Sequence, residues 1–238
     1  RSMDNGNTWV LLINDLNNKN LRKILINQNG DIFAGTASNG IYRSTDNGNN
    51  WTHISLTIYG ITTLALNGDG DIFAGTQPNG AYRTTDNGDT WMPINNGLTN
   101  IELWEIATNQ DGDIFAATNG GVFRSTNNGE NWIDVNNGLV GYIVISIEIA
   151  PNGYLYAGLH HNNGIYRSSD NGENWSYSGL NSIQPWSLTV NQSGVVFAAG
   201  DIMYRSIDYG SNWSPVGLIM STVSSFAKDQ SSKIYAIT

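Results

Sequence analysis

The chain has 238 residues, no cysteine and a net charge of −9, because 20 aspartates and glutamates outnumber 11 lysines and arginines. The acidic balance and the lack of a basic run argue against nucleic-acid and anionic-membrane partners, and the lack of cysteine excludes disulfides and thiolate metal sites. For these reasons we expect no nucleic-acid partner. No apolar stretch approaches the ~20 residues of a membrane span, so we also expect no direct membrane insertion.

An octapeptide with the pattern Ser-x-Asp-x-Gly-x-x-Trp recurs along the chain. Its six copies end at Trp9, Trp51, Trp91, Trp132, Trp175 and Trp213. Successive tryptophans are 42, 40, 41, 43 and 38 residues apart, which is typical of a β-propeller blade. We therefore expect a single domain, residues 1–238, built from these six repeats.

A second short motif precedes each of the five later octapeptides and occurs once more after the last of them. It reads DIFAGT from Asp31 and Asp71, DIFAAT from Asp113, YLYAGL from Tyr154, VVFAAG from Val195 and KIYAIT from Lys233. These runs are rich in β-branched and aromatic residues and are bounded by Gly and Asn, so they predict strands. With an apolar run before each and a run such as IYRS after each, one repeat contains four strands, a to d. The predicted fold class is all-β, a six-bladed β-propeller of four-stranded antiparallel blades.

Counting across the two ends favours closure of the ring at six blades. Six residues separate Thr36 from Arg43, and the same gap between Thr238 and Arg1 would place the next tryptophan 40 residues after Trp213. The N-terminal strands c and d would then pair with the C-terminal strands a and b, which removes the open sheet edges. The alternative is a fragment of a seven-bladed ring.

The residues of the octapeptide are explained by folding. An aspartate at its third position can accept hydrogen bonds from turn amides, and asparagine can replace it there. The glycine supplies the positive φ of a tight hairpin, and the tryptophan anchors packing between sheets. The structural positions are the six tryptophans together with Asp4, Asp46, Asp86, Asn127, Asp170 and Asp208.

The six octapeptides resemble the Asp-box (BNR) repeat of sialidases, and the compact blades are similar to those of sortilin-type, xyloglucanase-type and photosystem-assembly-factor propellers. The resemblance covers the whole chain, but it implies a fold that enzymes and non-enzymes share. A sialidase site would imply three arginines that clamp the substrate carboxylate. Every arginine except Arg22 directly precedes an Asp box, so one free arginine cannot make that clamp unless arginines of the repeats are recruited to it.

The alternative function is a glycoside hydrolase, sialidase-like or xyloglucanase-like, which needs two carboxylates about 5–10 Å apart. Glu105 and Glu148 are the catalytic candidates under this hypothesis, because each departs from the residue types at its repeat position. Glu102 and Asp201 also lie away from the repeat turns. The competing interpretation of Glu105 and Glu148 is a pair of solvated acids that line the central channel.

Two motifs could suggest a metal ion. The segments from Asn67 and Asn109 resemble the start of an EF-hand loop, but the bidentate Glu at position twelve is missing. His160 and His161 are adjacent on a loop, and no third ligand lies nearby in the sequence. We expect neither a metal nor a cofactor.

A ligand is expected on the face opposite the Asp boxes, where the b-to-c and d-to-a loops meet. Trp104 and Trp186 are the two tryptophans outside the boxes, and both stand where strand a begins. Exposed aromatic plates beside polar groups suit stacking on a sugar ring or gripping a peptide. The other interpretation is that they close the channel as core. The predicted ligand-binding residues are Arg22, Tyr59, Trp104, Glu105, Tyr142, His160 and Trp186.

The favoured function is a non-catalytic binding or scaffolding propeller that recognises a glycan, a protein or a peptide. No signal-peptide pattern opens the chain at Arg1. We nevertheless expect an exported protein in an extracellular, cell-surface or periplasmic location. It would act as a monomer or as part of a larger multidomain chain.

Overall fold

The computed structural model describes residues 1–4, 6–12, 16–17, 19–55, 60–141, 143–217, 223–228 and 233–237. These residues form 22 β-strands and no helix. The strands make five four-stranded sheets and one two-stranded sheet, each antiparallel and each with its strands in chain order. The predicted all-β class and the repeated four-stranded architecture are confirmed.

We call the five four-stranded sheets blades 1 to 5. Blade 1 contains β1 (Leu21–Ile26), β2 (Ile32–Thr36), β3 (Ile41–Ser44) and β4 (Thr52–Ser55). Blade 2 contains β5 (Gly60–Leu66), β6 (Ile72–Gln77), β7 (Gly80–Thr84) and β8 (Met92–Pro93). Blade 3 contains β9 (Leu103–Thr108), β10 (Ile114–Thr118), β11 (Gly121–Ser125) and β12 (Ile133–Asp134).

Blade 4 contains β13 (Val144–Ile149), β14 (Leu155–Leu159), β15 (Gly164–Ser168) and β16 (Ser176–Gly179). Blade 5 contains β17 (Ser187–Val190), β18 (Val196–Ala199), β19 (Met203–Ser206) and β20 (Ser214–Pro215). The two-stranded sheet, which we call the terminal hairpin, contains β21 (Ser225–Lys228) and β22 (Ile234–Ile237).

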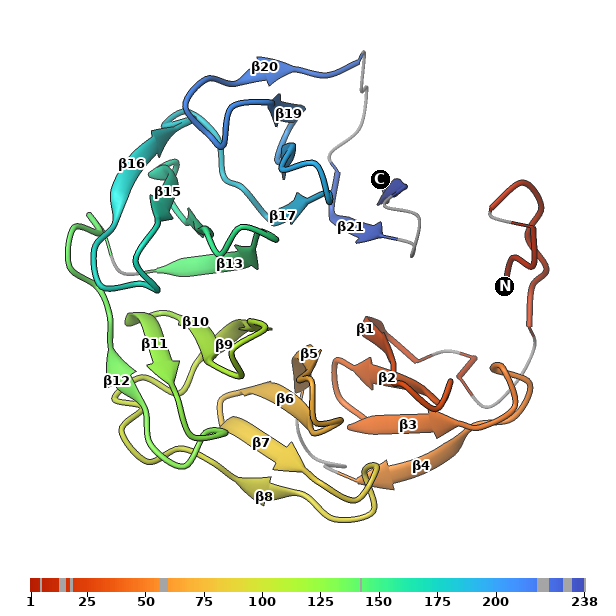
Figure 1. Cartoon of the computed structure of the whole chain (residues 1–238). Helices are drawn as coiled ribbons and strands as arrows, with labels where there is room; N and C mark the ends of the chain where they lie inside the picture. Colours follow the sequence, from red (N-terminus) through yellow and green to blue (C-terminus); the bar gives the residue numbers. More distant parts are fainter. Residues whose placement is uncertain are drawn as a thin grey trace.

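The sheets stand side by side around a common axis, as the blades of a propeller (Figure 1). The first strand of each blade lies innermost, and the inner strands of successive blades contact one another in the order β1, β5, β9, β13, β17, β21. Strand pairing repeats with the same register: Ile24 faces Ala34, Leu64 faces Ala74, and Ile106 faces Ala116. Residues at one repeat position can therefore be compared directly between blades.

The hydrophobic core is divided into clusters that lie between neighbouring blades. Between blades 2 and 3, for example, Phe73 and Ala65 of the earlier blade pack against Ile106, Ile114 and Phe123 of the later one. Large rings such as Phe73 are wholly removed from water, which contributes about 1.5–3 kcal/mol for each such side chain. Each blade is thus stabilised mainly through its neighbours.

The N-terminal segment does not show the predicted pairing with the C-terminal strands. Among the described residues, β21 and β22 pair only with each other. Arg1 instead donates from Nη1 to the carbonyl oxygen of Asn47 in blade 1, at 2.8 Å. A Cβ placed on Gly6 would lie 3.2 Å from Cε1 of Tyr235, so the first Asp box lies beside the terminal hairpin. Residues 218–222, which precede β21 in the sequence, and residues 229–232, between β21 and β22, lie outside the described part.

Candidate functional site

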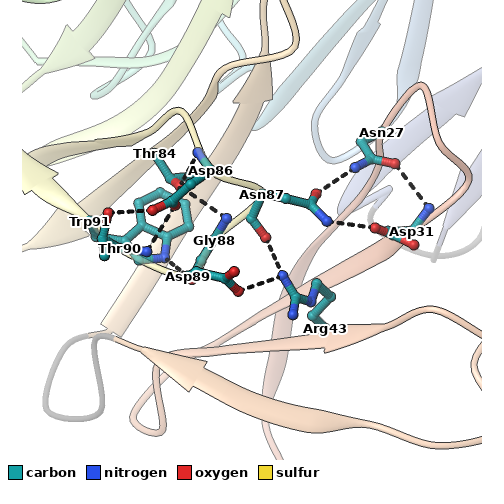
Figure 2. A network of polar contacts seen from close by, with 10 residues as sticks. All are labelled: Asn27, Asp31, Arg43, Thr84, Asp86, Asn87, Gly88, Asp89, Thr90 and Trp91. Atoms are coloured by element: carbon teal, nitrogen blue, oxygen red, sulfur yellow. Dashed lines mark hydrogen bonds and ion pairs between the residues drawn. The ribbon is translucent and has the colours of Figure 1, made fainter.

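The Asp box is a closed hydrogen-bond network within one turn. In the box of blade 2, Asp86 Oδ1 accepts from the Thr90 backbone N–H at 2.8 Å, and Asp86 Oδ2 accepts from the Thr90 hydroxyl at 2.5 Å (Figure 2). The Thr84 hydroxyl donates to Asp86 Oδ1 at 2.7 Å and accepts from the Gly88 N–H at 2.9 Å. Donation from Thr90 lowers the pKa of Asp86 to about 2. The carboxylate is therefore fully used by its own turn.

The box also joins one blade to the next. Arg43 of blade 1 donates from Nη1 to the Asn87 carbonyl at 2.6 Å and to Asp89 Oδ1 at 2.9 Å (Figure 2). Asn87 Nδ2 donates to Asp31 Oδ2 at 2.7 Å, and Asn27 Nδ2 donates to Asn87 Oδ1 at 2.7 Å. The network therefore links the Asp-box turn of blade 2 to the side chains of blade 1.

The asparagine variant of the box keeps the same turn. Asn127 Oδ1 accepts from the Ser125 hydroxyl at 2.9 Å and from the Asn131 backbone N–H at 3.0 Å. One oxygen atom suffices for these contacts, and a carboxylate charge is not needed for them.

Glu105 lies on inner strand β9 and is tied to two other blades. Its Oε1 accepts from Lys23 Nζ of blade 1 at 3.1 Å, and its Oε2 accepts from the Ile147 backbone N–H of blade 4 at 3.0 Å. The charge of Glu105 is the main cause that raises the pKa of Lys23.

Glu148, on inner strand β13, stands at a different repeat position but also binds a lysine and a backbone N–H. Its Oε1 accepts from Lys228 Nζ of the terminal hairpin at 2.7 Å and from the Val190 backbone N–H of blade 5 at 3.2 Å. Burial raises the pKa of Glu148, and the attraction of Lys228 opposes that rise. Both acids of the catalytic hypothesis are therefore held in ion pairs and in hydrogen bonds to the backbone of the following blade.

The repeat shows what Glu105 does. At the same position in blade 2, the Thr63 hydroxyl accepts from the Ile106 backbone N–H at 3.3 Å, and in blade 5 the Ser187 hydroxyl accepts from the Phe226 N–H at 3.3 Å. Glu105 thus supplies the same inter-blade acceptor as a threonine or a serine.

On the face opposite the Asp boxes, Trp104 belongs to a polar cluster. It is half-buried, and its Nε1 donates to Asn119 Oδ1 at 2.7 Å. Asn119 Nδ2 in turn donates to the Glu102 carboxylate. The amide between them fixes the indole at the start of β9.

Trp186 lies on the same face, before β17. Its side chain is 43% exposed, and the His160 ring approaches it edge-on, with the ring centroids 5.9 Å apart. The His161 ring meets the His160 ring edge-on, with the centroids 4.2 Å apart. Burial, with the neighbouring charge of His161, lowers the pKa of His160, so this imidazole is neutral at physiological pH.

The remaining predicted ligand residues are placed as follows. Arg22 is exposed on β1. Tyr59 and Tyr142 lie outside the described residues. Of the predicted set, the structure thus brings His160 and Trp186 into contact, whereas Glu105 is engaged in the inter-blade contacts described above.

A cavity of about 1090 Å³ opens on the Asp-box face, between the a-to-b turns of blades 2 to 5. Asn67, Asn109, Asn152 and Gln192 supply polar groups from these turns, and Lys228 lines it as well. None of the predicted ligand residues lines this cavity. Among the described residues, no group of three or more His, Asp or Glu is placed to hold a metal ion.

Sequence reasoning missed a second joint between blades, the tetrapeptide Asn-Asn-Gly-Leu at 95–98 and 136–139. Asn95 Oδ1 accepts from the Ala81 N–H at 2.7 Å, and the Asn96 carbonyl accepts from the Trp132 N–H of the next blade at 2.9 Å. Its repetition 41 residues apart was the signal that could have identified it.

Comparison with known proteins places the chain among β-propellers. The model of the DUF6242 beta propeller domain family matches residues 1–98. No curated protein matches the sequence. Among the described residues, no helix has the length and apolarity that a membrane crossing requires.

Several solved structures share the fold at low sequence identity. The extracellular domain of the hybrid two-component system BT3049 from B. thetaiotaomicron superposes with a TM-score of 0.79 at 15% identity, over 95% of this chain and 33% of that one. YCF48 bound to a D1 peptide gives a TM-score of 0.73 at 15% identity, over 95% and 77%. The GH74 enzyme of Niastella koreensis gives 0.69 at 17% identity, over 83% and 37%. The chain therefore spans about a third of the first of these proteins, and its neighbours include a GH74 enzyme as well as the extracellular domain of a two-component system.

Proposed function

We propose that this Asp-box β-propeller is a non-catalytic binding module of an extracellular, cell-surface or periplasmic protein, and that it recognises a carbohydrate or a peptide on the face opposite its Asp boxes. The observation that carries the proposal is the Trp186 ring, 43% exposed and flanked edge-on by His160. A solvent-facing indole beside a neutral imidazole combines apolar area with a hydrogen-bonding group, as ligand-binding surfaces do.

Trp104 supports the same face. Its indole is held by Asn119, which also contacts Glu102, so the aromatic and acidic groups are fixed before any ligand arrives. Preorganised side chains lose little conformational entropy on binding. The two tryptophans lie in blades 3 and 5, with the His160 loop of blade 4 between them in chain order.

The neighbours support the ligand class and the location. YCF48 was solved with a peptide bound, and BT3049 contributes an extracellular domain of a larger chain. A peptide ligand and an exported, multidomain context for this chain agree with those two cases.

The second candidate, a glycoside hydrolase, is favoured by the similarity in fold to GH74 enzymes. The carboxylates argue against it. An acid catalyst must be able to approach a glycosidic oxygen, but Glu105 and Glu148 each hold a lysine and a backbone N–H of the neighbouring blade. The inter-blade role therefore accounts for both acids.

The test is a binding screen of the folded chain against glycan and peptide arrays, followed by titration of each hit. Trp186→Ala should weaken binding by at least about tenfold, as removal of a central aromatic anchor does. Trp9→Ala is the matched control, because Trp9 is an exposed tryptophan of the first Asp box on the other face, and it should leave binding unchanged.

Hydrolysis is measured in parallel on xyloglucan and on sialosides. Turnover that disappears in Glu105→Gln or Glu148→Gln would establish the enzyme hypothesis and overturn ours. A folded chain that binds nothing on either array, or binding that Trp186→Ala does not affect, would also reject the proposed face.

A further inference from the structure

The face of β1 that points away from blade 2 is bare. Ile24 is 58% exposed and Ile26 is 59% exposed. At the repeat position of Ile24 the other blades hold residues that are 2–6% exposed, namely Leu64, Ile106, Ile147 and Leu188. Blade 1 thus exposes to solvent two isoleucines on one face of its inner strand β1.

In blades 2 to 5 this face is covered by the inner half of the preceding blade. Ile106 packs against Ala65 and Phe73, which belong to the two inner strands of blade 2. Leu64 packs in the same way against Phe33 and Leu25 of blade 1. The same interface at β1 would require strands a and b of a preceding blade, packed against Ile24 and Ile26.

The blade position that precedes blade 1 already has its outer part, the region of strands c and d. The N-terminal segment occupies it. A Cβ on Gly48 would lie 3.5 Å from Leu12 Cδ1, just as one on Gly88 would lie 2.7 Å from Ile54 Cδ1 of blade 1. Arg1 reaches the Asn47 carbonyl as Arg43 reaches that of Asn87. The first Asp box therefore belongs to the blade that precedes blade 1.

The terminal hairpin is not the inner half of that blade. In complete pairs of blades, the aromatic residue of the second strand meets the box glycine of the following blade: Phe33 meets Gly88, and Tyr156 meets Gly210, both at 3.1 Å from a placed Cβ. Tyr235 of β22 meets Gly6 in this manner, at 3.2 Å. The terminal hairpin thus lies one position before the N-terminal box.

We propose that the ring has seven blade positions, made up of the five complete blades, the terminal hairpin and the N-terminal box. In this arrangement the position between the terminal hairpin and β1 takes an antiparallel β-hairpin, the inner strands a and b of the repeat whose box is Ser2–Trp9. Figure 1 shows the N-terminal segment at the periphery and β21 near the axis, in line with an outer and an inner half that belong to different blades.

The chemistry of the occupant follows from the interfaces on its two sides. Toward β1 the hairpin must present a Phe or Tyr as the second residue of its strand b. The equivalent residues of blades 1 to 3, which pack against the following blade, are Phe33, Phe73 and Phe115. Toward the terminal hairpin it must present aliphatic residues, as Leu188 and Val196 do toward blade 4. Whether a hairpin occupies the position before β1 does not depend on what the face with Trp186 and His160 binds.

The experiment uses the absence of cysteine from the chain. Ile24→Cys is alkylated in the folded protein, with Asn29→Cys on an exposed turn and Ile106→Cys in a covered position as references. The same three variants are then prepared with a copy of residues 101–123 fused directly before Arg1. This fusion preserves the repeat register, because Arg124 follows that segment in blade 3.

In the unfused chain, Ile24→Cys should react nearly as fast as Asn29→Cys. The fused hairpin should slow the reaction of Ile24→Cys by at least about tenfold while leaving Asn29→Cys unchanged, because a covered site reacts only after local opening. A fused segment of the same composition in scrambled order should give no protection. A second fusion, residues 60–82 from blade 2, provides an independent measurement if the first does not fold.

Three results would overturn the proposal. Protection of Ile24→Cys in the unfused monomer would show that the ring closes on itself, as a six-bladed arrangement requires. Protection that depends on protein concentration would show that a second copy covers β1. Two folded fusions that both leave Ile24→Cys reactive would show that no inner hairpin fits there.

Discussion

The carboxylate of Glu105 accepts the backbone N–H of Ile147, a residue of the next blade, at 3.0 Å. This contact joins the inner edges of blades 3 and 4, at a place where no strand ladder connects two sheets. Thr63 and Ser187 make the equivalent contact elsewhere with a neutral hydroxyl. What this site requires is therefore an acceptor atom and not a negative charge.

Replacement of Glu105 should show that requirement. Glu105→Gln retains an oxygen for the Ile147 N–H and should change the free energy of unfolding little, whereas Glu105→Ala leaves that donor unpaired and should cost about 1–3 kcal/mol. Chemical denaturation of both variants measures the difference. Equal losses in the two variants would show that the charge and its ion pair with Lys23 matter more than the acceptor.

Acid should weaken the Asp boxes in a defined pH range. The pKa of Asp86 is lowered from 3.8 to about 2 by donors from Thr90, so its contribution to stability is complete above about pH 4 and is lost as the pH falls toward 2. Asp86→Asn should therefore lower the melting temperature at pH 7 and have a much smaller effect at pH 2.

The fourth box supplies the reciprocal variant. Asn127→Asp should raise the melting temperature at neutral pH, because the second carboxylate oxygen can accept from the Asn131 side chain as Asp46 accepts from Asn50 at 2.6 Å. That gain should disappear at pH 2. A gain that is the same at both pH values would contradict the assignment to an ionised carboxylate.

The arginine before each box should matter only where a following box covers it. Arg124 donates to the Asn171 carbonyl at 2.7 Å and to Glu173 Oε1 at 2.6 Å, so Arg124→Met should destabilise the fold by about 1–3 kcal/mol. Arg205 holds the same repeat position in blade 5 but is exposed, and Arg205→Met should change stability by less than about 0.5 kcal/mol. Urea titration of the two variants gives both values. Similar losses would mean that the bond to the next box contributes nothing measurable.

Gly97 should be the least replaceable residue of the Asn-Asn-Gly-Leu joint. It has a φ of +90°, and an added Cβ would lie 2.2 Å from the Trp132 carbonyl oxygen. Gly112 has a φ of +87° with nothing within 4 Å, so Gly112→Ala reports the cost of backbone conformation alone, about 1 kcal/mol. Gly97→Ala should cost clearly more than Gly112→Ala in thermal unfolding. Equal costs would show that the neighbouring blade moves aside freely.

The repeat positions could be predicted from the sequence, and the contacts across the ring could not. The Asp-box spacing and the strand motifs identified the all-β propeller, because both signals are local. Lys23 and Glu105 are 82 residues apart and meet across an intervening blade, so their pairing depends on the curvature of the ring. Curvature is set by packing between sheets, which no short motif encodes.

The number of blade positions is hidden from the sequence for the same reason. A count of residues from Thr238 to Arg1 fits a six-bladed ring, but the spacing within each repeat would be the same in a ring of seven. Exposure of Ile24 and the contact of Gly6 with Tyr235 depend on which surfaces face each other. The sequence predicted that His160 and Trp186 lie on the same face. It did not predict that their rings touch, because that contact depends on how blades 4 and 5 pack.

The arginine joints have a consequence for how such proteins can evolve. Each one ends on a main-chain oxygen, that of Asn47, Asn87, Asn128, Asn171 or Tyr209. A main-chain acceptor is present whatever the side chain, and the change from asparagine to tyrosine in the last of these leaves the bond in place. A duplicated or transplanted gene segment that encodes one repeat can therefore be inserted beside any other without a compensating substitution at this main-chain acceptor.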